Sequence, residues 1–484
     1  MRLPIVVHLV GVVLRMFGLM FAVPLGTALI YQEHAEAIGF TVAGLATVVA
    51  GHVMRWAGGS RHDDIRRLEA MAIVAGTWLA VAVAAAVPYV WSGFGPIDAL
   101  FESMSGLTTT GATIVTDFSK VSRSLFLWRS LTQWLGGMGV IALFIAVLPR
   151  LAIAGRQLFF AEAPGPTDEK LTPQVRKTAA VLWKLYAAIS AAEVAALMLA
   201  GMPLYDSVCH AMTTLAAGGF SPHPESVMGY ANPAVEWIVT FFMFVAGANF
   251  ALQYRALHGQ PSALTRDDEF RTYAGVVLVS TGLLAAFLWR DGYRVIEAAR
   301  HAAFQVVSIV TTTGYASADF AKWSEQAQMV LFALMFVGGC AGSAGGGPKV
   351  VRLLLVSRYL RSELRRTLHP RAVLPVKLNG GLVPDDVMRA VLAFFLLYLL
   401  VFAVSALVVV LLGADIVTGL TATIACLGNI GPGLNMVGPM GHFAHLHPVS
   451  RLVLTAAMWI GRLEVVTVLA LLRPEVWRSV RWRQ

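Results

Sequence analysis

Residues 310–320 read VTTTGYASADF, and residues 107–118 read LTTTGATIVTDF. Each stretch places three threonines and a glycine between an apolar run and a short polar segment. Two further stretches follow a similar pattern, AMTTLAAGGFSPH at 211–223 and ACLGNIGPGLN at 425–435. A pattern that recurs through a chain indicates structural repeats, and it has to be identified before single elements are assigned.

Four glycines anchor an alignment of these stretches at intervals of about 100 residues: Gly111, Gly219, Gly314 and Gly431. The segments that end at these glycines align without gaps: DALFESMSGLTTTG, DSVCHAMTTLAAGG, HAAFQVVSIVTTTG and TGLTATIACLGNIG. We interpret each as a helix of about ten residues, too short to cross a bilayer, followed by an extended return segment. The helices are expected to begin at Asp98, Asp206, His301 and Thr418, where Asp and Thr are good N-caps and His is a weaker one.

The composition is that of a membrane protein. Hydrophobic residues make up 57% of the chain and charged residues only 13%, whereas soluble domains carry about 25% charged residues. The sequence therefore predicts an all-α polytopic membrane protein, whose first span is retained rather than cleaved as a signal peptide. Spanning helices are expected near 5–30, 37–57, 70–93, 124–149, 178–202, 233–256, 271–290, 325–356, 386–413 and 448–472.

Lysine and arginine residues predict the orientation. They gather after the second, fourth and sixth expected spans, in 349–389 and in the C-terminal tail, whereas 203–232 and 414–447 contain none. Because positive residues remain cytoplasmic, we expect both termini inside, and we attribute the net charge of +9 to topology rather than to nucleic-acid binding. The exceptions fall on the predicted outer side: Arg290, Arg294, Arg300 and Lys322.

The four repeated stretches predict a site for a cation. Non-helical backbone at membrane depth is tolerated only where protein buries it or where it lines a watery path. The negative ends of four short helices then point to one axis, and glycine allows carbonyl groups to turn inward. A ring of carbonyl oxygens replaces the hydration shell of a monovalent cation. The alternative is that these segments are ordinary outer loops or helix-packing glycines.

The stretch GGCAGSAGGGPKV at 338–350 falls inside an expected span and should break it. We interpret it as a flexible obstruction below the cation site, although small residues also allow tight helix packing. No Gly-Lys-Ser/Thr sequence follows, so it is not a phosphate-binding loop. Arg462 lies near the middle of the last span, where a charge is costly. It either pairs structurally with a carboxylate or carbonyl group, or repels cations below the site; Glu464 is expected to face elsewhere.

Other polar residues have weaker interpretations. Cys209, Cys340 and Cys426 form no pair that indicates a disulfide or zinc site. The spacing of His442, His445 and His447 suits a metal, but histidines in a surface loop are commoner. Asp117 and Asp319, which follow two of the return segments, either concentrate cations or are simply solvated.

At this point the chain resembles the Trk/Ktr/HKT superfamily of potassium transporters, and within it the TrkH/TrkG branch. The resemblance covers nearly the whole chain. It rests on TTTGAT, GGFS, TTTGYASADF and GNIGPGLN in the four repeats, on WLGGMGVI and AEAPGPTDEKLTP after the first, on GGCAGSAGGGPKV in the third and on IGRLE in the last. Pro348 departs from the family, which has an aliphatic residue there.

The resemblance implies four helix–pore loop–helix repeats in a pseudo-fourfold array, preceded by an N-terminal helix pair, in a homodimer. The expected boundaries are 1–69 for the N-terminal extension, 70–177, 178–270 and 271–385 for the first three repeats, and 386–484 for the fourth repeat with the tail. It also implies potassium uptake across a bacterial inner membrane, with a separate cytosolic regulator of the TrkA type that binds NAD and ATP. The basic segment 349–389 either reflects topology alone or helps to dock that partner. No organic cofactor and no enzymatic activity are expected of this chain.

Residue by residue, the resemblance implies a potassium filter and a gate. The filter comprises Thr109, Thr110, Gly111, Ala217, Gly218, Gly219, Thr312, Thr313, Gly314, Asn429, Ile430 and Gly431. The gate comprises Gly339, Gly342, Ser343, Gly345, Gly346, Gly347 and Arg462. Plant relatives that prefer sodium have a serine at the first filter glycine, so Gly111 favours potassium.

Two other functions remain open from the residues. A secondary symporter that couples potassium to sodium or protons also uses broken helices, but it should carry buried carboxylates at mid-membrane. The sequence suggests few of these, Glu193 being the clearest, and this favours a passive gated path. A membrane scaffold with an inactive pore is disfavoured by the four intact glycines.

Overall fold

The computed structural model describes residues 1–59, 65–151, 171–372 and 374–478. The first span is formed by α1 (Leu3–Gly18), a short 3₁₀ turn and α2 (Ala22–Ile30), and α3 (His34–Ala57) packs back against it. Gly11 and Gly51 allow this close packing, because a Cβ on either would stand under 3 Å from the backbone of the other helix. The N-terminal helix pair expected from the sequence is therefore present.

The rest of the chain repeats one arrangement four times: a long helix, a short helix, a non-helical return segment and a second helix. The first unit contains α4 (Arg67–Trp91), α5 (Pro96–Leu107) and α6 (Arg123–Leu151); the second α8 (Leu171–Leu199), α9 (Leu204–Leu215), α10 (Pro233–Ala246) and α11 (Phe250–Leu257); the third α13 (Asp268–Arg290), α14 (Val295–Val310), α15 (Glu325–Leu334) and α16 (Val350–Leu368); the fourth α17 (Asp385–Leu411), α18 (Ile416–Leu427), α19 (Pro448–Arg462) and α20 (Val465–Leu471). Small connecting elements complete the described part: α12 (Ser262–Arg266), α21 (Pro474–Arg478) and an antiparallel pair of two-residue strands, β1 (Lys377–Leu378) and β2 (Gly381–Leu382).

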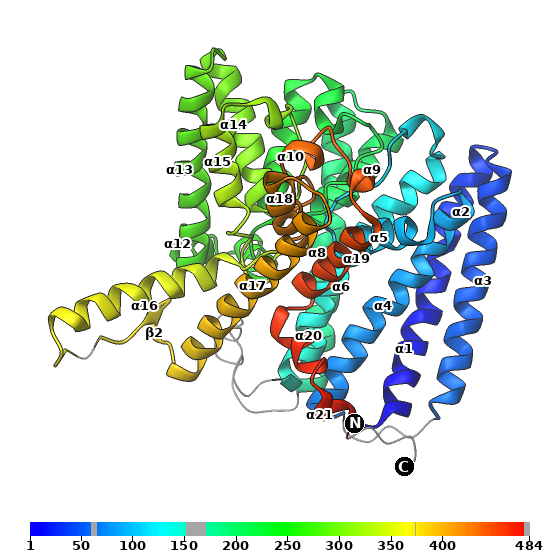
Figure 1. Cartoon of the computed structure of the whole chain (residues 1–484), viewed down its shortest axis with the longest axis horizontal. Coiled ribbons are helices and arrows are strands. Elements are labelled where there is room, and N and C mark those ends of the chain that lie inside the picture. The colour runs from blue at the N-terminus through cyan, green and yellow to red at the C-terminus, as the bar shows by residue number, and fades with distance from the viewer. Residues whose placement is uncertain (60–64, 152–170, 373, 479–484) are drawn as a thin grey trace.

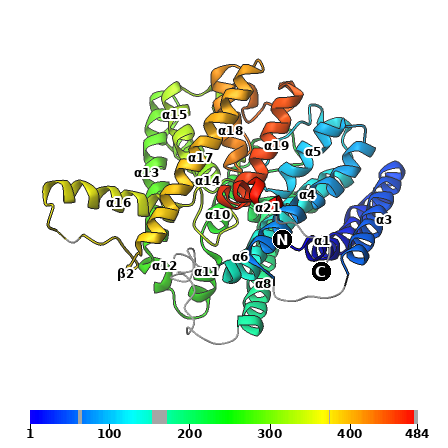
Figure 2. The ribbon, with the colours of Figure 1, turned by 60° about the horizontal axis from the view of Figure 1, so that its bottom comes forward.

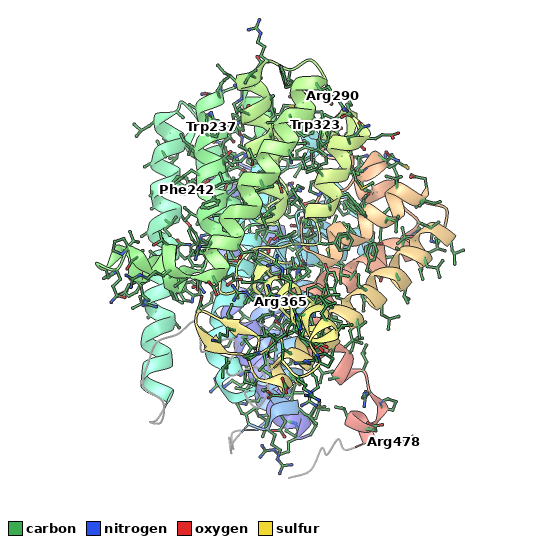
Figure 3. The ribbon with its side chains drawn as sticks, turned by 90° about the vertical axis from the view of Figure 1, so that its left-hand side faces the viewer. Trp237, Phe242, Arg290, Trp323, Arg365 and Arg478 are labelled. Carbon is green, nitrogen blue, oxygen red and sulfur yellow. The ribbon has the colours of Figure 1, made fainter. Side chains whose placement is uncertain are left out.

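The short helices lie in the interior, surrounded by the long ones. Helices α1 and α3 stand at one edge of the molecule, and α16 projects from the opposite side (Figures 1 and 2). The N-terminus and α21 lie at the same end (Figure 1). Arg290 lies at the other end, away from Arg365 and Arg478 (Figure 3). Arg290 and α21 thus lie at opposite ends of the molecule.

Six helices among the described residues are long and apolar enough to cross a membrane, and two sharply bent pairs raise the number to eight. The segment expected at 124–149 forms α6, whereas the one at 325–356 is broken between α15 and α16 as its glycines predict. The bent pairs are α10 with α11, at 103°, and α19 with α20, at 113°. The chain is thus a multi-pass membrane protein.

Both bends correct the expectation of continuous helices at 233–256 and 448–472. At the first, the side chain of Asn249 accepts hydrogen bonds from the backbone N–H groups of Ala251 and Leu252 and so begins a new helix. At the second, Glu464 has a φ of +69°, which a continuous helix does not allow. Sequence pattern missed both bends because each side of the break remains apolar.

The starts of the short helices also differ from expectation. Asp98 and Asp206 lie in the first turn rather than at the N-cap, where Gly95 and Pro203 stand. Acidic residues in the first turn still complement the helix dipole. In the fourth repeat, Asp415 is the N-cap.

The third short helix is the largest departure. It begins at Val295 instead of His301 and is therefore longer than the other three. The N-cap position before it is taken by Arg294.

Several glutamates besides Glu193, the one that the sequence suggested, are buried in the described part of the chain. Glu69, Glu102, Glu193, Glu236 and Glu269 are all buried. Three of them pair with arginine residues, and Glu269 accepts hydrogen bonds from backbone N–H groups. Neither carboxylate oxygen of Glu193 has a hydrogen-bond partner within the described residues. Parts of the basic segments after the second and fourth expected spans, the segment AEAPGPTDEK and the end of the C-terminal tail lie outside the described residues.

Candidate functional site: a ring of return segments and the loop beneath it

The four return segments share one backbone conformation. The residue two places before each glycine has a positive φ: 53° at Thr109, 54° at Ala217, 62° at Thr312 and 54° at Asn429. The glycines that follow also have positive φ: 83° at Gly111, 73° at Gly219, 81° at Gly314 and 107° at Gly431. Positive φ is uncommon outside glycine and costs on the order of 1–3 kcal/mol. A strained conformation that occurs four times at equivalent positions marks a functional site.

Backbone hydrogen bonds fix these segments in the same way. The N–H of the residue before each glycine donates to a carbonyl near the end of the preceding helix, at 2.8 Å in three repeats and 2.9 Å in the third. The pairs are Thr110 with Ser105, Gly218 with Thr213, Thr313 with Ser308 and Ile430 with Ala425. The alignment predicted from sequence is therefore an alignment in space.

The segments close into a ring, as the surroundings of the four glycines show. A Cβ on Gly111 would stand 2.2 Å from the carbonyl oxygen of Gly218, and one on Gly219 would stand 1.9 Å from that of Thr313. One on Gly314 would stand 1.9 Å from the oxygen of Ile430, and one on Gly431 2.7 Å from that of Thr110. Each glycine thus meets the carbonyl of the next repeat, and the fourth returns to the first. No other residue type fits at these positions without a backbone shift.

A small opening lies on one side of this ring. It has a volume of about 70 Å³ and is lined by residues of all four repeats, among them Gly111, Gly219, Gly314 and Gly431. A water molecule needs roughly 10–15 Å³ of such space, so several fit. A ring of carbonyl groups next to a hydrated opening can exchange water ligands of a cation for backbone oxygens.

Two carboxylates beyond the ring are each paired with a lysine. Asp117 lies 3.1 Å from Lys120, and Asp319 lies 3.1 Å from Lys322. Hydrogen bonds from Ser119, followed by that from Lys120, hold the pKa of Asp117 below its usual range. A lysine neutralises each carboxylate, which disfavours a cation-concentrating mouth. Asp117 is exposed and fits the interpretation of a solvated outer residue, whereas Asp319 is largely buried.

The histidines near 445 do not form a metal cluster in the described part of the chain. The rings of His442 and His445 stack at 4.1 Å between centroids, and His447 caps α19 by accepting from the N–H of Val449.

Below the ring, residues 335–349 form a non-helical loop between α15 and α16. We call it the glycine loop. The N–H of Gly346 donates to the hydroxyl of Thr312 at 2.6 Å. A Cβ on Gly345 would stand 2.7 Å from the carbonyl oxygen of Thr311, and one on Gly346 would stand 2.6 Å from that of Gly428. The glycine loop therefore lies directly against the third and fourth return segments.

Other residues of the glycine loop contact the bend between α10 and α11. A Cβ on Gly339 would stand 3.1 Å from the carbonyl oxygen of Gly247, and one on Gly342 would stand 3.0 Å from the side chain of Asn249. The Ser343 hydroxyl donates within the loop, to Cys340, at 2.6 Å. Gly342 and Gly347 have positive φ, at 73° and 72°. The candidate gate residues thus form one buried element, and packing of straight helices does not explain it.

Two cationic side chains hold consecutive carbonyl groups of the glycine loop. Arg462 is buried, and its Nη1 donates to the carbonyl of Ala344 at 3.0 Å. Lys349 donates through Nζ to the carbonyl of Gly345. The Nε and Nη2 atoms of Arg462 have no hydrogen-bond partner among the described residues. Arg462 therefore pairs with a carbonyl group but keeps its charge beneath the ring.

A further ion pair lies where both broken helices resume. Arg352, near the start of α16, lies 2.5 Å from Glu464, which immediately precedes α20. The guanidinium also stacks on Phe394, 4.1 Å from the ring centroid. Glu464 and Arg462 thus have different partners. Because Glu464 stands at the break between α19 and α20, helical spacing did not predict its partner.

Sequence analysis missed several residues that contact the site. Glu269 accepts from the N–H groups of Ala341 and Val351 and so ties the middle of the glycine loop to the first turn of α16. Arg129 and Gln133, both buried on α6, contact the second return segment. The spacing of four residues puts both polar side chains on one face of an apolar helix. This pattern could have predicted that the face contacts polar groups inside the protein.

Comparisons with known proteins agree with this geometry. The sequence model of the TrkH family, described as a cation transport protein, matches residues 37–272 and 290–478. The chain is 36% identical to the Trk system potassium uptake protein TrkH of Salmonella typhimurium, over 98% of this chain and 99% of that protein. It is 34% identical to TrkG of Escherichia coli K12, over 98% and 99%. The crystal structure of the potassium transporter TrkH from Vibrio parahaemolyticus matches with a TM-score of 0.91 and 33% identity, over 99% of this chain and 100% of that one.

Proposed function

Because the chain belongs to the TrkH family of cation transport proteins, we propose that it carries potassium ions into the cell across a bacterial inner membrane. The transported ion is its substrate, and the chain needs no organic cofactor and catalyses no reaction. Relatives of the same length are named potassium uptake proteins, which supports the choice of ion.

The observation that carries this proposal is the closed ring of four glycines, each against the carbonyl of the next repeat. In the proposal the ring is the selectivity filter, formed by residues 109–111, 217–219, 312–314 and 429–431. The repeats are 70–177, 178–270, 271–385 and 386–484, after the extension 1–69. Backbone oxygens at fixed positions favour the cation whose dehydration free energy is offset by coordination to those oxygens.

The glycine loop is proposed to be the gate. It lies against the ring, and a buried arginine beneath it opposes a cation by charge. Transport then requires the loop to move aside and the hydrogen bonds from Arg462 and Lys349 to break. Its many glycines make such a movement possible.

The cytoplasmic side is proposed to be the end that carries the N-terminus, α21 and α16 (Figure 1). Positive residues of α16 support this orientation, and the exposed part of this helix is available to a partner. We propose that a cytosolic NAD- and ATP-binding protein of the TrkA type regulates the gate, and that the transporter acts as a homodimer. The family resemblance supports both partners.

The test is growth and rubidium uptake of potassium-uptake-deficient bacteria that express the chain together with its regulator. Rescue on low potassium, with rubidium uptake that exceeds sodium uptake, is expected. If the chain inserts into the membrane and carries no alkali cation, the proposal is wrong.

A second candidate, potassium transport coupled to protons, is favoured by Glu193. This carboxylate is fully buried on α8 without a hydrogen-bond partner in the described residues, and the hydroxyl of nearby Thr214 donates instead to His210. A buried carboxyl group of this kind can carry a proton. The test measures rubidium uptake by wild type and by Glu193→Gln at several proton gradients. Coupling is supported if uptake by wild type depends on the gradient and uptake by the variant does not.

A further inference from the structure

The four return segments are braced in different ways. In segments 1 and 3, the residues flanking the strained position are threonines whose hydroxyl groups bond to each other. Thr108 and Thr110 lie 2.8 Å apart, and Thr311 and Thr313 lie 2.8 Å apart. This bond closes each turn on itself through its own side chains.

Segments 2 and 4 lack this bond, because their residues at these places carry no hydroxyl group. In segment 4 they are Gly428 and Ile430. The side-chain amide of Asn429, between them, donates instead to the hydroxyl of Thr110 and to the carbonyl of Met458, each at 3.0 Å. An amide side chain thus replaces the missing threonine pair.

In segment 2 the corresponding residues are Ala216 and Gly218, and the amide comes from another element. Gln133 is fully buried on α6. Its Nε2 donates to the carbonyl of Gly218 at 2.7 Å, and its Oε1 accepts from the N–H of Phe220 at 3.1 Å. The glutamine therefore holds the backbone on both sides of Gly219.

The side chain of Gln133 also occupies the space that a threonine would need. The three atoms nearest to a Cβ on Gly218 would all belong to this side chain, with Cδ at 2.4 Å, Oε1 at 2.5 Å and Nε2 at 2.9 Å. Gly218 itself does not have a positive φ. The glycine at 218 and the glutamine at 133 are thus complementary.

We propose that Gln133 is a positioning residue of the selectivity filter, which sets the carbonyl of Gly218 in place of a threonine pair. The inference rests on the proposed function, since it concerns ion selection. The carbonyl of Gly218 is the one that Gly111 faces in the ring. A shift of this carbonyl therefore changes the ring where segments 1 and 2 meet.

Arg129, one turn earlier on α6, extends the brace. It is buried, donates to the carbonyl of Ser221 at 3.3 Å and stacks on Phe220 at 4.0 Å. Its charge is balanced by Glu102 at 2.8 Å. One face of α6 therefore holds segment 2 from its filter carbonyl to its outer end.

The first experiment measures rubidium and sodium uptake of Gln133→Ala and Gln133→Glu in potassium-uptake-deficient cells. The ratio of rubidium to sodium uptake is expected to fall about tenfold in both, equivalent to about 1.4 kcal/mol. In the glutamate variant the acceptor remains but the donor to Gly218 is lost. The matched control is Gln328→Ala, since Gln328 also donates to two backbone carbonyls, those of Ala321 and Trp323, neither of which belongs to the ring. Its uptake ratio should equal that of wild type.

The second experiment rebuilds a threonine pair in the absence of the glutamine. Gln133→Ala combined with Ala216→Thr and Gly218→Thr provides two hydroxyl groups at the places of Thr108 and Thr110, and the shortened side chain removes the atoms nearest to a Cβ at 218. Recovery of most of the lost selectivity supports the proposal. The melting temperature of each purified variant distinguishes a positioning role from a merely structural one. A merely structural role predicts a lower melting temperature with an unchanged ratio of rubidium to sodium uptake.

Two results overturn the inference: a wild-type ratio in Gln133→Ala, or a triple variant that folds as wild type does but remains as unselective as Gln133→Ala. Failure of the proposed function is distinct, because wild type itself would then carry no rubidium.

Discussion

The side-chain amide of Asn429 donates a hydrogen bond of 3.0 Å to the hydroxyl of Thr110, a residue 319 positions away in sequence. The bond ties the last return segment to the first, where the ring of four repeats must close. Asn429 combines this role with a φ of 54°, a conformation that asparagine tolerates better than most residues.

Replacing Asn429 with glycine keeps the backbone angle accessible but removes the tie. Lost buried hydrogen bonds cost about 1–3 kcal/mol, so we expect a lower melting temperature and a lower ratio of rubidium to sodium uptake. Asn435→Gly is the control, because Asn435 has a similar φ of 53° but lies on the outer surface. An unchanged uptake ratio in Asn429→Gly would show that the tie does not shape the ring.

Replacing Arg462 with alanine should open the gate more often. The side chain donates to the Ala344 carbonyl, and a hydrogen bond with a charged partner contributes about 1.5–3 kcal/mol. We expect basal rubidium uptake without the regulator to rise about tenfold or more. Exposed Arg473→Ala is the control for a lost charge. Uptake that is unchanged or lower in Arg462→Ala argues against a gating role.

The ion pair of Arg352 with Glu464 should couple the two resumed helices on either side of the gate. Arg352→Gln and Glu464→Gln are each expected to raise basal uptake, and the double variant should do so no more than either alone. The pair Arg366 with Glu363, on the exposed part of α16, supplies the control substitutions. Additive effects of the two substitutions would mean that the pair is not the coupled unit.

The buried pair of Arg129 with Glu102 should dominate stability near the ring. Arg129→Met leaves the Glu102 carboxylate unpaired, which costs about 3–5 kcal/mol. Adding Glu102→Gln removes the buried charge, so the double variant should melt at a higher temperature than Arg129→Met. For the exposed pair of Asp117 and Lys120, Asp117→Asn should leave the melting temperature unchanged. Equal melting temperatures for the single and the double Arg129 variants would contradict this account.

The four-repeat plan was predictable because it rests on local chemistry. Glycine is required where φ is positive and a neighbouring carbonyl lies close, and this requirement is visible at Gly111, Gly219, Gly314 and Gly431 in sequence. The break between α15 and α16 was visible in the same way, from its glycines. Arg462 was visible as a charged residue inside an apolar span. Each of these features follows from the properties of a single residue type.

Other features depend on contacts between distant segments. Gln133 acquires its partners only when α6 packs behind Gly218, and Glu464 meets Arg352 only after both helices have bent. The starts of the short helices were misjudged because Asp98 and Asp206 suit both the N-cap and the first turn. Glu69, Glu102 and Glu236 were missed because the arginine residues that pair with them come from other segments of the chain.

The central claim is that four segments form one selective ring, and its most direct test is a serine at each of the four glycines in turn. The ratio of rubidium to sodium uptake is measured for each variant and for Gly282→Ser, whose glycine has nothing within 4 Å. A serine at any ring position meets both a positive φ and a carbonyl oxygen of the next repeat, so all four variants should lose selectivity while Gly282→Ser keeps it. A ring variant that folds and retains the wild-type ratio would contradict the claim.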